Sequence, residues 1–347
     1  MTSTVCFERT VRRLLTKPRR GQGGFLRAAN SPGVDNKMPE LEDTGFAQIG
    51  TYRFKRLALG AMRLLSSNLE REGQTIECFA EPVDPEANRE IMLAAVNECG
   101  IGYIDFARGY GAWPGAGESF FRQWMSPYPE GLLWATKIGY DRDAEGGWVL
   151  NLSPETIRRD VGLSVEELGA PLPLLYLMAG STKDVTVRNR QDCVTASFRP
   201  LLDAYNRGEV KHLGIANVTA SELKTLLDFA PISVVQNKFT VASLADPAQR
   251  EVLDLCREHN LPFVAWGIFQ SDDFDDWKPE PNLIHAAQEL SATVQDASIA
   301  ILLNAVPHLV ALTGASRRKS LSASVLAANL AVPPEILRRF GPDLGDQ

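Results

Sequence analysis

The sequence lacks the signals of several special classes of protein. Its five cysteines form no C-x-x-C pair and are odd in number, which argues against a zinc ribbon or a disulfide framework and favours a reducing compartment. The most apolar stretch, residues 298–315, is interrupted by Asn304, Pro307 and His308, so it indicates a buried helix followed by a strand rather than a membrane span. A composition of 44% hydrophobic and 23% charged residues excludes disordered and collagen-like chains.

A dinucleotide-binding fingerprint is also missing. Gly21, Gly23 and Gly24 lie in the run GQGGF, but no strand precedes them and no acidic residue follows at the required distance. No metal site is predicted, because no group of cysteines and histidines has ligand spacing.

Charge is distributed unevenly along the chain. Residues 1–37 hold eight Lys and Arg against two acidic residues, although the whole chain has a net charge of −7. The acidic remainder argues against a nucleic-acid groove in the folded part. We predict that residues 1–45 are a basic leader outside the folded domain. Two interpretations of it stay open: an Arg-rich targeting peptide for organellar import of an otherwise cytoplasmic protein, or a disordered leader or a translation start placed too far upstream.

From about residue 56 onward, short apolar runs alternate with amphipathic segments at a regular interval. The expected strands are residues 56–62, 103–107, 132–138, 174–179, 210–217, 232–239, 262–269 and 309–316. The expected helices are residues 88–99, 118–125, 154–168, 194–207, 220–229, 249–259, 283–294 and 321–330. Eight βα units in succession predict a closed (β/α)8 TIM barrel rather than an open sheet.

Two further segments refine this α/β fold, which we place over residues 46–347. Residues 46–54 form two alternating stretches around Gly50, which predicts an N-terminal β-hairpin that plugs the floor of the barrel. The connection 64–87 is long, and loops that follow barrel strands open at the catalytic end. We therefore expect it to cover a substrate pocket.

Polar residues recur at the expected carboxyl ends of the strands, where such barrels place their chemistry. Asp105 ends the second strand, Tyr110 lies in the loop after it, and Lys137 ends the third strand. An ammonium group lowers the pKa of a nearby phenol and a carboxylate holds the ammonium in place, so the phenol can give a proton to a carbonyl oxygen. Tyr110, Lys137 and Asp105 are the predicted catalytic residues, acting on a small-molecule substrate.

These motifs, in this order, resemble the aldo-keto reductase superfamily over about residues 46–330. The matching segments are RLALGAMRL at 56–64, YIDFARGYG at 103–111, WATK at 134–137, EVKHLGIAN at 209–217, VVQN at 234–237 and TGAS at 313–316. The resemblance implies the same three catalytic residues and the cofactor NADP(H), bound without a Rossmann fingerprint. It further implies cofactor contacts from Asn217, Gln236 and Trp266 at the nicotinamide and from Ser316, Arg317 and Ser320 at the adenosine end.

The resemblance fails at three places. At the adenosine end, Ser320, Ala323 and Ser324 stand where the family has Gln or Arg, then Glu and Asn. Ala179 stands where the family has a histidine that hydrogen-bonds the substrate carbonyl, and no histidine of the chain is near that strand end. After Trp266, the family usually has a Pro-Leu-Gly turn beside the pyrophosphate, whereas residues 267–276 here contain four aspartates. Four carboxylates beside a pyrophosphate would repel it. The alternative is a solvated loop that points away.

Two functions are therefore compatible with the sequence. The first is an NADP(H)-dependent oxidoreductase that acts on a carbonyl or related group of a small, specialised metabolite, as a monomer or homo-oligomer without a membrane or nucleic-acid partner. The second is a repurposed barrel that acts as a non-redox acid/base enzyme or a regulatory binding protein. In either case we expect an apolar substrate pocket lined by Met62, Trp113, Trp134, Met178 and Ala179.

Overall fold

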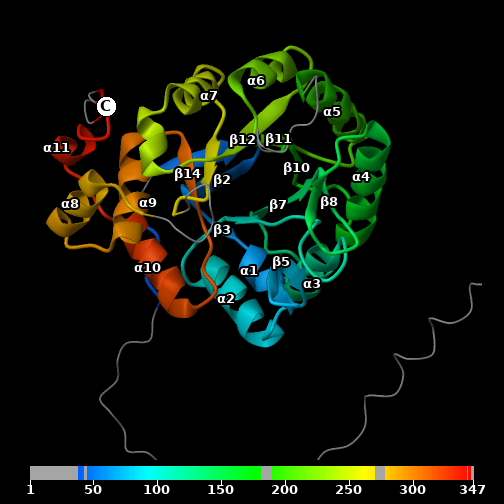
Figure 1. The fold of residues 1–347 in the computed structure, drawn as a ribbon, viewed down its shortest axis with the longest axis horizontal. Helices are drawn as coiled ribbons and strands as arrows, with labels where there is room; N and C mark the ends of the chain where they lie inside the picture. The colour runs from blue at the N-terminus through cyan, green and yellow to red at the C-terminus, as the bar shows by residue number, and fades with distance from the viewer. Residues whose placement is uncertain (1–37, 43–44, 181–189, 270–277, 342, 345–347) are drawn as a thin grey trace, which may run out of the picture. The chain divides into compact units, whose positions relative to one another are not determined.

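The computed structural model describes residues 38–42, 45–180, 190–269, 278–341 and 343–344. Eight of the described strands are parallel neighbours in a closed barrel, which β14 and β3 complete by pairing with each other (Figure 1). The predicted (β/α)8 fold is confirmed. The barrel strands are β3 (Leu57–Gly60), β6 (Tyr103–Asp105), β7 (Leu133–Ile138), β10 (Leu174–Met178), β11 (Leu213–Ala216), β12 (Ile232–Lys238), β13 (Phe263–Trp266) and β14 (Leu309–Thr313).

Helices surround the barrel in the order that the sequence pattern predicts (Figure 1). Local capping fixes several of their starts: the Ser153 side chain accepts from the Thr156 amide at the start of α4, and Thr219 and Glu222 form a capping box at the start of α6. The helices are α2 (Pro85–Asn97), α3 (Ala116–Met125), α4 (Pro154–Leu168), α5 (Arg190–Asn206), α6 (Ala220–Leu227), α7 (Pro247–Glu258), α8 (Pro281–Glu289), α9 (Val294–Ala305) and α10 (Arg318–Ala328). Two further helices, η1 (Val241–Ala245) and α11 (Pro334–Leu337), are short.

The predicted helix at 283–294 is wrong in extent. Helix α8 ends at Glu289, and α9 begins after Thr293, whose side chain accepts a hydrogen bond from the Asp296 amide. The Thr293 and Asp296 side chains form a capping box, which specifies a new helix start. Helix α9 and strand β14 are the buried helix and strand that the apolar stretch 298–315 predicts.

The amino-terminal end of the barrel is closed by an antiparallel hairpin of β1 (Phe46–Ile49) and β2 (Tyr52–Lys55). Phe54 packs into the cluster that fills the barrel interior, with its ring centroid 5.4 Å from that of Tyr103. Gly50, at φ +57°, leaves no room for a Cβ against His212, which precedes β11. The predicted floor hairpin is thus confirmed.

The folded body extends further toward the N-terminus than predicted. Leu41 is fully buried, and its amide donates a 3.0 Å hydrogen bond to the carbonyl of Cys99. Residues 38–42 therefore belong to the barrel body rather than to a leader that runs to residue 45. Residues 1–37 of the predicted leader lie outside the described residues.

At the opposite end, two insertions follow barrel strands. After β3 come a single helical turn, α1 (Met62–Leu65), and a hairpin of β4 (Ser67–Arg71) and β5 (Gln74–Ala80). After β7 comes a hairpin of β8 (Tyr140–Arg142) and β9 (Trp148–Leu150). Both lie at the carboxyl ends of the strands, where we expected the catalytic end.

Successive side chains of each barrel strand alternate between two packed regions. On β7, Leu133 and Ala135 belong to the barrel interior, whereas Trp134 belongs to the larger cluster between strands and helices. This alternation decides which residues reach the mouth of the barrel. Among the described helices, none is long and apolar enough to cross a membrane.

Candidate active site

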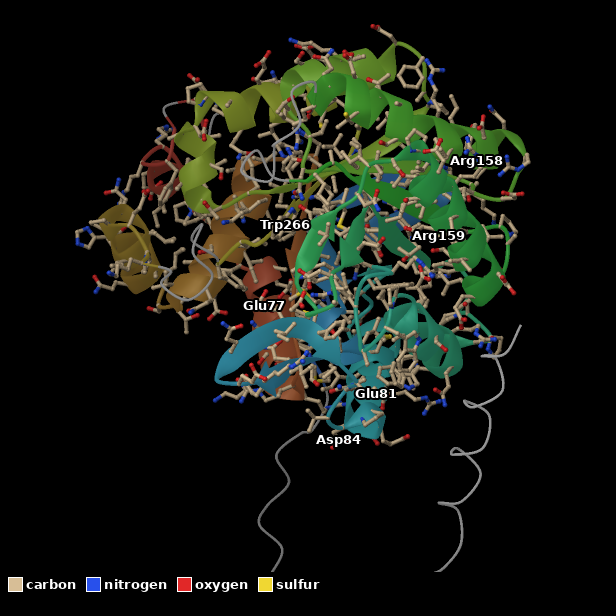
Figure 2. All side chains as sticks on the ribbon, turned by 45° about the vertical axis from the view of Figure 1, so that its right-hand side comes forward. Glu77, Glu81, Asp84, Arg158, Arg159 and Trp266 are labelled. Atoms are coloured by element: carbon tan, nitrogen blue, oxygen red, sulfur yellow. The ribbon has the colours of Figure 1, made fainter. Side chains whose placement is uncertain are left out.

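The candidate site lies inside the carboxyl end of the barrel. Asp105 is the last residue of β6, Lys137 lies near the end of β7, and Gln236 lies on β12. Each is buried and occupies an inward position of its strand. Figure 2 labels Trp266 at the carboxyl end of β13 and Glu77 on the β4–β5 hairpin, which mark two sides of this end of the molecule.

The Asp105 carboxylate is the centre of a buried hydrogen-bond network. The Lys137 ammonium donates to Oδ1, while Tyr103 Oη and Gln236 Nε2 donate to Oδ2 at 3.1 and 2.9 Å. Lys137 Nζ also donates to the carbonyl of Phe106 at 2.9 Å. Burial lowers the pKa of Lys137, and the Asp105 charge opposes that change. The predicted pairing of Lys137 with Asp105 is present.

Two tyrosines of this network were missed by the sequence reasoning. The Tyr103 and Tyr176 hydroxyls lie 3.0 Å apart inside the barrel, and burial raises the pKa of both. Tyr176 has space for its ring because residue 214 is glycine: a Cβ there would lie 2.4 Å from the ring. Both tyrosines point into the barrel interior. On β6, Tyr103 lies two residues before Asp105, and on β10, Tyr176 lies two residues after the inward Leu174. Because barrel strands are buried on both faces, the sequence carried no signal that separated these inward tyrosines from outward aromatic residues such as Trp134.

Tyr110 lies beside this network, but its electrostatics differ from the prediction. Its pKa is raised well above the ordinary value, first by burial and then by the charges of Asp105 and Cys78, while Arg142 acts in the opposite direction. Within the described residues no hydrogen bond joins Tyr110 to Lys137, whose ammonium is bound to Asp105. The expectation that Lys137 lowers this pKa is therefore not met.

Two of the predicted pocket residues are not available to a ligand. Trp134 is only 3% exposed and packs outside the barrel, with its ring centroid 4.8 Å from Tyr128 and 5.6 Å from Phe121. Ala179 is fully buried in the same outer cluster, and its carbonyl accepts a 2.8 Å hydrogen bond from Arg190. Both assignments were wrong because strand alternation turns these side chains toward the helices.

The other three predicted pocket residues have accessible surface. Met178 is half-buried and packs against the barrel interior, and Met62 is half-buried at the start of α1. Trp113, in the Tyr110 loop, is 49% exposed. These positions are compatible with a pocket wall, which remains a prediction.

The predicted nicotinamide residues lie on neighbouring strands. Trp266 is half-buried, and its Nε1 donates to Asn217 Oδ1 at 3.0 Å. The Asn217 carbonyl accepts a 2.7 Å bond from Arg190, which fixes this strand end. Gln236 Nε2 donates to Asp105 Oδ2, which ties this residue to the buried network. Residues 270–277, with the aspartates of the predicted acidic loop, lie outside the described residues.

The predicted adenosine residues lie at the start of α10. Ser316 and Ser320 are half-buried and Arg317 is exposed. Helix α10 begins without a side-chain cap, so its first amide groups are available to an anion. The next arginine is engaged elsewhere: Arg318 makes two hydrogen bonds to Glu98, at 3.1 and 2.6 Å.

The β8–β9 hairpin contributes residues that no sequence motif indicated. Trp148 meets the Tyr110 ring edge-on, with centroids 6.3 Å apart and an interplanar angle of 82°. It approaches so closely that a Cβ at Gly109 would lie 2.7 Å from the indole. Arg142 lies 3.2 Å from the centroid of the Trp148 ring. The two hairpins thus complete the surroundings of Tyr110.

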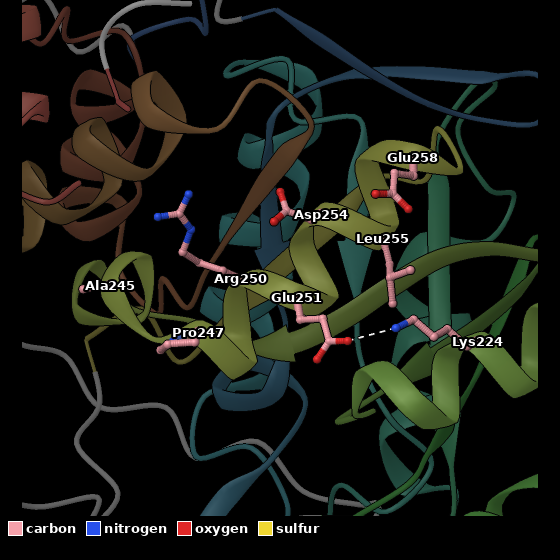
Figure 3. A pocket seen from close by; sticks show the side chains of 8 residues that line it. All are labelled: Lys224, Ala245, Pro247, Arg250, Glu251, Asp254, Leu255 and Glu258. Atoms are coloured by element: carbon pink, nitrogen blue, oxygen red, sulfur yellow. Dashed lines mark hydrogen bonds and ion pairs between the residues drawn. The ribbon is translucent and has the colours of Figure 1, made fainter. Parts of the chain in front are cut away.

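Two surface pockets lie away from these residues. One, of about 570 Å³, lies between α6 and α7, where Lys224 and Glu251 form an ion pair of 2.9 Å (Figure 3). The other, of about 620 Å³, includes Phe46 of the floor hairpin and His308 before β14. Within the residues that the structure describes, no group of three or more His, Cys, Asp and Glu could hold a metal ion.

Comparison with known proteins places this geometry in a family. Residues 56–339 match the model of the aldo/keto reductase family. Pyridoxine 4-dehydrogenase of Escherichia coli is 27% identical over 83% of this chain and 94% of its own length.

Two solved structures share the fold. Glycerol dehydrogenase from Gluconobacter oxydans aligns with a TM-score of 0.67 at 18% identity, over 87% of this chain and 95% of that one. A Bombyx mori aldo-keto reductase in complex with NADP aligns with a TM-score of 0.60 at 15% identity, over 86% and 92% of the two chains. The family match spans most of the chain, and the barrel agrees with it. The chain therefore belongs to the aldo/keto reductase family, whose members are oxidoreductases.

Proposed function

We propose that this protein is an NADP(H)-dependent reductase of a carbonyl group in a small, weakly polar metabolite, with Tyr110 as the proton donor. The observation that carries the proposal is the buried network in which Asp105 binds Lys137 and lies close enough to Tyr110 to influence its pKa. The half-buried or exposed Met178 and Trp113 favour an apolar ligand.

In the proposed reaction, Tyr110 gives its phenolic proton to the carbonyl oxygen, which becomes the alcohol. The reduced nicotinamide, when bound, supplies the hydride for the carbonyl carbon. Asp105 holds the Lys137 ammonium, and Lys137 keeps the carbonyl of Phe106 in place at the start of the Tyr110 loop. These residues orient the loop that carries the phenol.

The described residues fit an NADP(H) molecule at both of its ends. At the nicotinamide end, Trp266 offers an indole face, and Asn217 and Gln236 offer amide groups on the neighbouring strands. At the adenosine end, the uncapped start of α10 and the exposed Arg317 suit a 2′-phosphate, with Ser316 and Ser320 nearby in the chain. This is why we favour NADPH over NADH.

A second candidate function follows from the absence of the family's histidine and from the raised pKa of Tyr110. Without the family's histidine, the site lacks one donor for a substrate carbonyl. A barrel that binds a small molecule and uses Tyr110, Lys137 and Asp105 for proton transfer alone, or only binds, would have the same features.

Coenzyme binding separates these functions. We expect NADPH to quench the tryptophan fluorescence of the purified protein more strongly than NADH at equal concentration, and to support reduction of aromatic aldehydes. Arg317→Gln should weaken NADPH binding about tenfold or more and leave NADH binding unchanged, because one charge-assisted hydrogen bond is lost. Arg318→Gln is the matched control, since Arg318 is paired with Glu98. Absence of quenching by either nucleotide at millimolar concentration would favour the non-redox function.

A further inference from the structure

Arg142 joins the three segments that surround Tyr110. From the end of β8, it donates to the carbonyls of Glu77 and Cys78 on β5 at 2.9 and 3.2 Å. It also donates to the carbonyl of Gly109, the residue before Tyr110, at 3.3 and 3.4 Å. Through these bonds one side chain holds the β4–β5 hairpin against the loop that carries Tyr110.

The same guanidinium organises its own hairpin. It donates to the Gly146 carbonyl at 2.8 Å, in the turn between β8 and β9, and its central carbon lies 3.2 Å from the centroid of the Trp148 ring. The ring of Phe79 on β5 lies 5.3 Å away. Because Trp148 in turn contacts Tyr110, Arg142 fixes the position of an aromatic ring beside the phenol.

The charge of Arg142 is not cancelled by a contacting carboxylate. In the described part of the chain its direct partners are neutral carbonyl oxygens, and no ion pair includes it. Burial lowers its pKa to about 10, so it stays charged at neutral pH, and the more distant Cys78, Tyr110, Glu77 and Asp143 act against that lowering. An unmatched cation acts on its neighbours more strongly than a paired one.

Tyr110 is one of those neighbours. The charged and titratable groups that face it are Asp105, Cys78 and Arg142; the first two disfavour the phenolate and Arg142 favours it. The hydrogen bonds of the Lys137 ammonium in the described residues go to Asp105 and to the carbonyl of Phe106. Arg142, on an inserted hairpin, adds a positive charge on the side of the Tyr110 loop, where it binds the carbonyl of Gly109 and stacks on Trp148.

Resting on the proposed function, we propose that Arg142 is a positioning residue: it holds both hairpins around Tyr110 and supplies the positive charge that stabilises the phenolate left after proton transfer. Arg142 keeps all its protons in this step. The Tyr110 proton moves to the carbonyl oxygen, and the guanidinium stabilises the negative charge that remains on the phenol oxygen.

The test compares two variants that separate charge from hydrogen bonding. Arg142→Lys keeps the charge, and Arg142→Gln keeps an N–H donor for the carbonyls without the charge. Difluorotyrosine at position 110, a more acidic phenol, reports its ionisation by ¹⁹F NMR. We expect Arg142→Gln to shift this titration upward by about one pH unit or more, and Arg142→Lys to shift it less. Arg56→Gln is the matched control, since Arg56 also donates to carbonyls, those of Val306 and Leu309, at the other end of the barrel.

Kinetics provide the second measurement. Reduction by Arg142→Gln should have a kcat lowered about tenfold, because one pKa unit is a factor of about ten in acidity, with the KM for NADPH unchanged. Equal titrations of position 110 in wild type and Arg142→Gln would overturn the proposal, as would equal losses of kcat in Gln and Lys variants. The NMR titration requires no turnover, so it gives its result even where the proposed carbonyl reduction fails.

Discussion

The two ends of the barrel bury opposite kinds of groups. At the amino-terminal end, Ile49 and Phe54 of the floor hairpin fill the interior with apolar surface. At the carboxyl-terminal end, the interior positions hold Asp105, Lys137 and Gln236; all three are buried, and Lys137 and Gln236 both donate to Asp105. The apolar residues lie on strands β1 and β2 of the floor hairpin, whereas the polar residues lie on the barrel strands β6, β7 and β12.

This difference indicates that the floor residues contribute to the stability of the fold, whereas the residues at the carboxyl end serve the chemistry of the site. Burial of apolar side chains is favourable by itself, at about 25 cal/mol per Å², whereas burial of charges is costly unless they are paired and hydrogen-bonded. The carboxyl end therefore reduces the stability of the fold in exchange for a preorganised polar network. Substitutions at the two ends should therefore affect different measurements.

The largest expected effect is at the carboxyl end. Tyr110→Phe removes the phenolic proton and should lower turnover roughly 10²- to 10⁴-fold, as expected for loss of a general acid. Fluorescence titration with NADPH should give an unchanged dissociation constant, because the ring remains. Turnover equal to wild type would remove Tyr110 from the mechanism.

At the amino end the effect should appear in stability alone. Ile49 is 1% exposed in the interior cluster, so Ile49→Ala should lower the free energy of unfolding by about 2–5 kcal/mol. Urea denaturation measures this, and kcat of the folded variant should match wild type. Val83→Ala, at a residue that is 89% exposed, is the control and should change stability by less than about 0.5 kcal/mol. A large loss of kcat in Ile49→Ala would show that the two ends are coupled.

Introducing a histidine at the end of β10 compares the inward and outward faces of that strand. Ala179 is fully buried in the outer cluster, so Ala179→His should destabilise the protein by about 1–3 kcal/mol through overpacking and give no gain in turnover. Thermal unfolding and aldehyde reduction measure the two effects. Met178→His, at the inward position beside it, tests the same imidazole on the other face. Faster reduction by Ala179→His would place residue 179 at the substrate after all.

The smallest expected effect is a pH dependence at the floor. Burial, with a contribution from Lys211, lowers the pKa of His212 below its ordinary 6.5. The unfolded chain therefore binds this proton more tightly, and stability should fall as the pH drops below about 6.5, by less than about 1 kcal/mol. Urea denaturation of His212→Gln over this range should show a shallower loss than wild type. Identical pH profiles would remove His212 as a source of acid sensitivity.

Much of the fold could be predicted from local patterns of apolar and polar residues in the sequence. Eight apolar runs separated by amphipathic segments specified the barrel, and the alternation around Gly50 specified the floor hairpin, because both patterns depend on neighbours in sequence. The approach of Asp105 and Lys137 followed as well, since parallel strands bring their carboxyl ends together. The second helix start at Thr293 was also present in the sequence as a capping box.

Tertiary structure alone decided which face each strand residue occupies and what surrounds Tyr110. A barrel strand is buried on both faces, so the segment WATK shows no alternation of polar and apolar residues. It does not reveal that Lys137 points inward while Trp134 points outward. The raised pKa of Tyr110 likewise depends on Cys78 and Arg142, which belong to two hairpins distant in sequence. The sequence by itself determines the spacing of apolar residues and the order of the strands and helices. Which face of a doubly buried strand a side chain occupies, and which charges from the inserted hairpins lie near Tyr110, is decided only when the barrel closes.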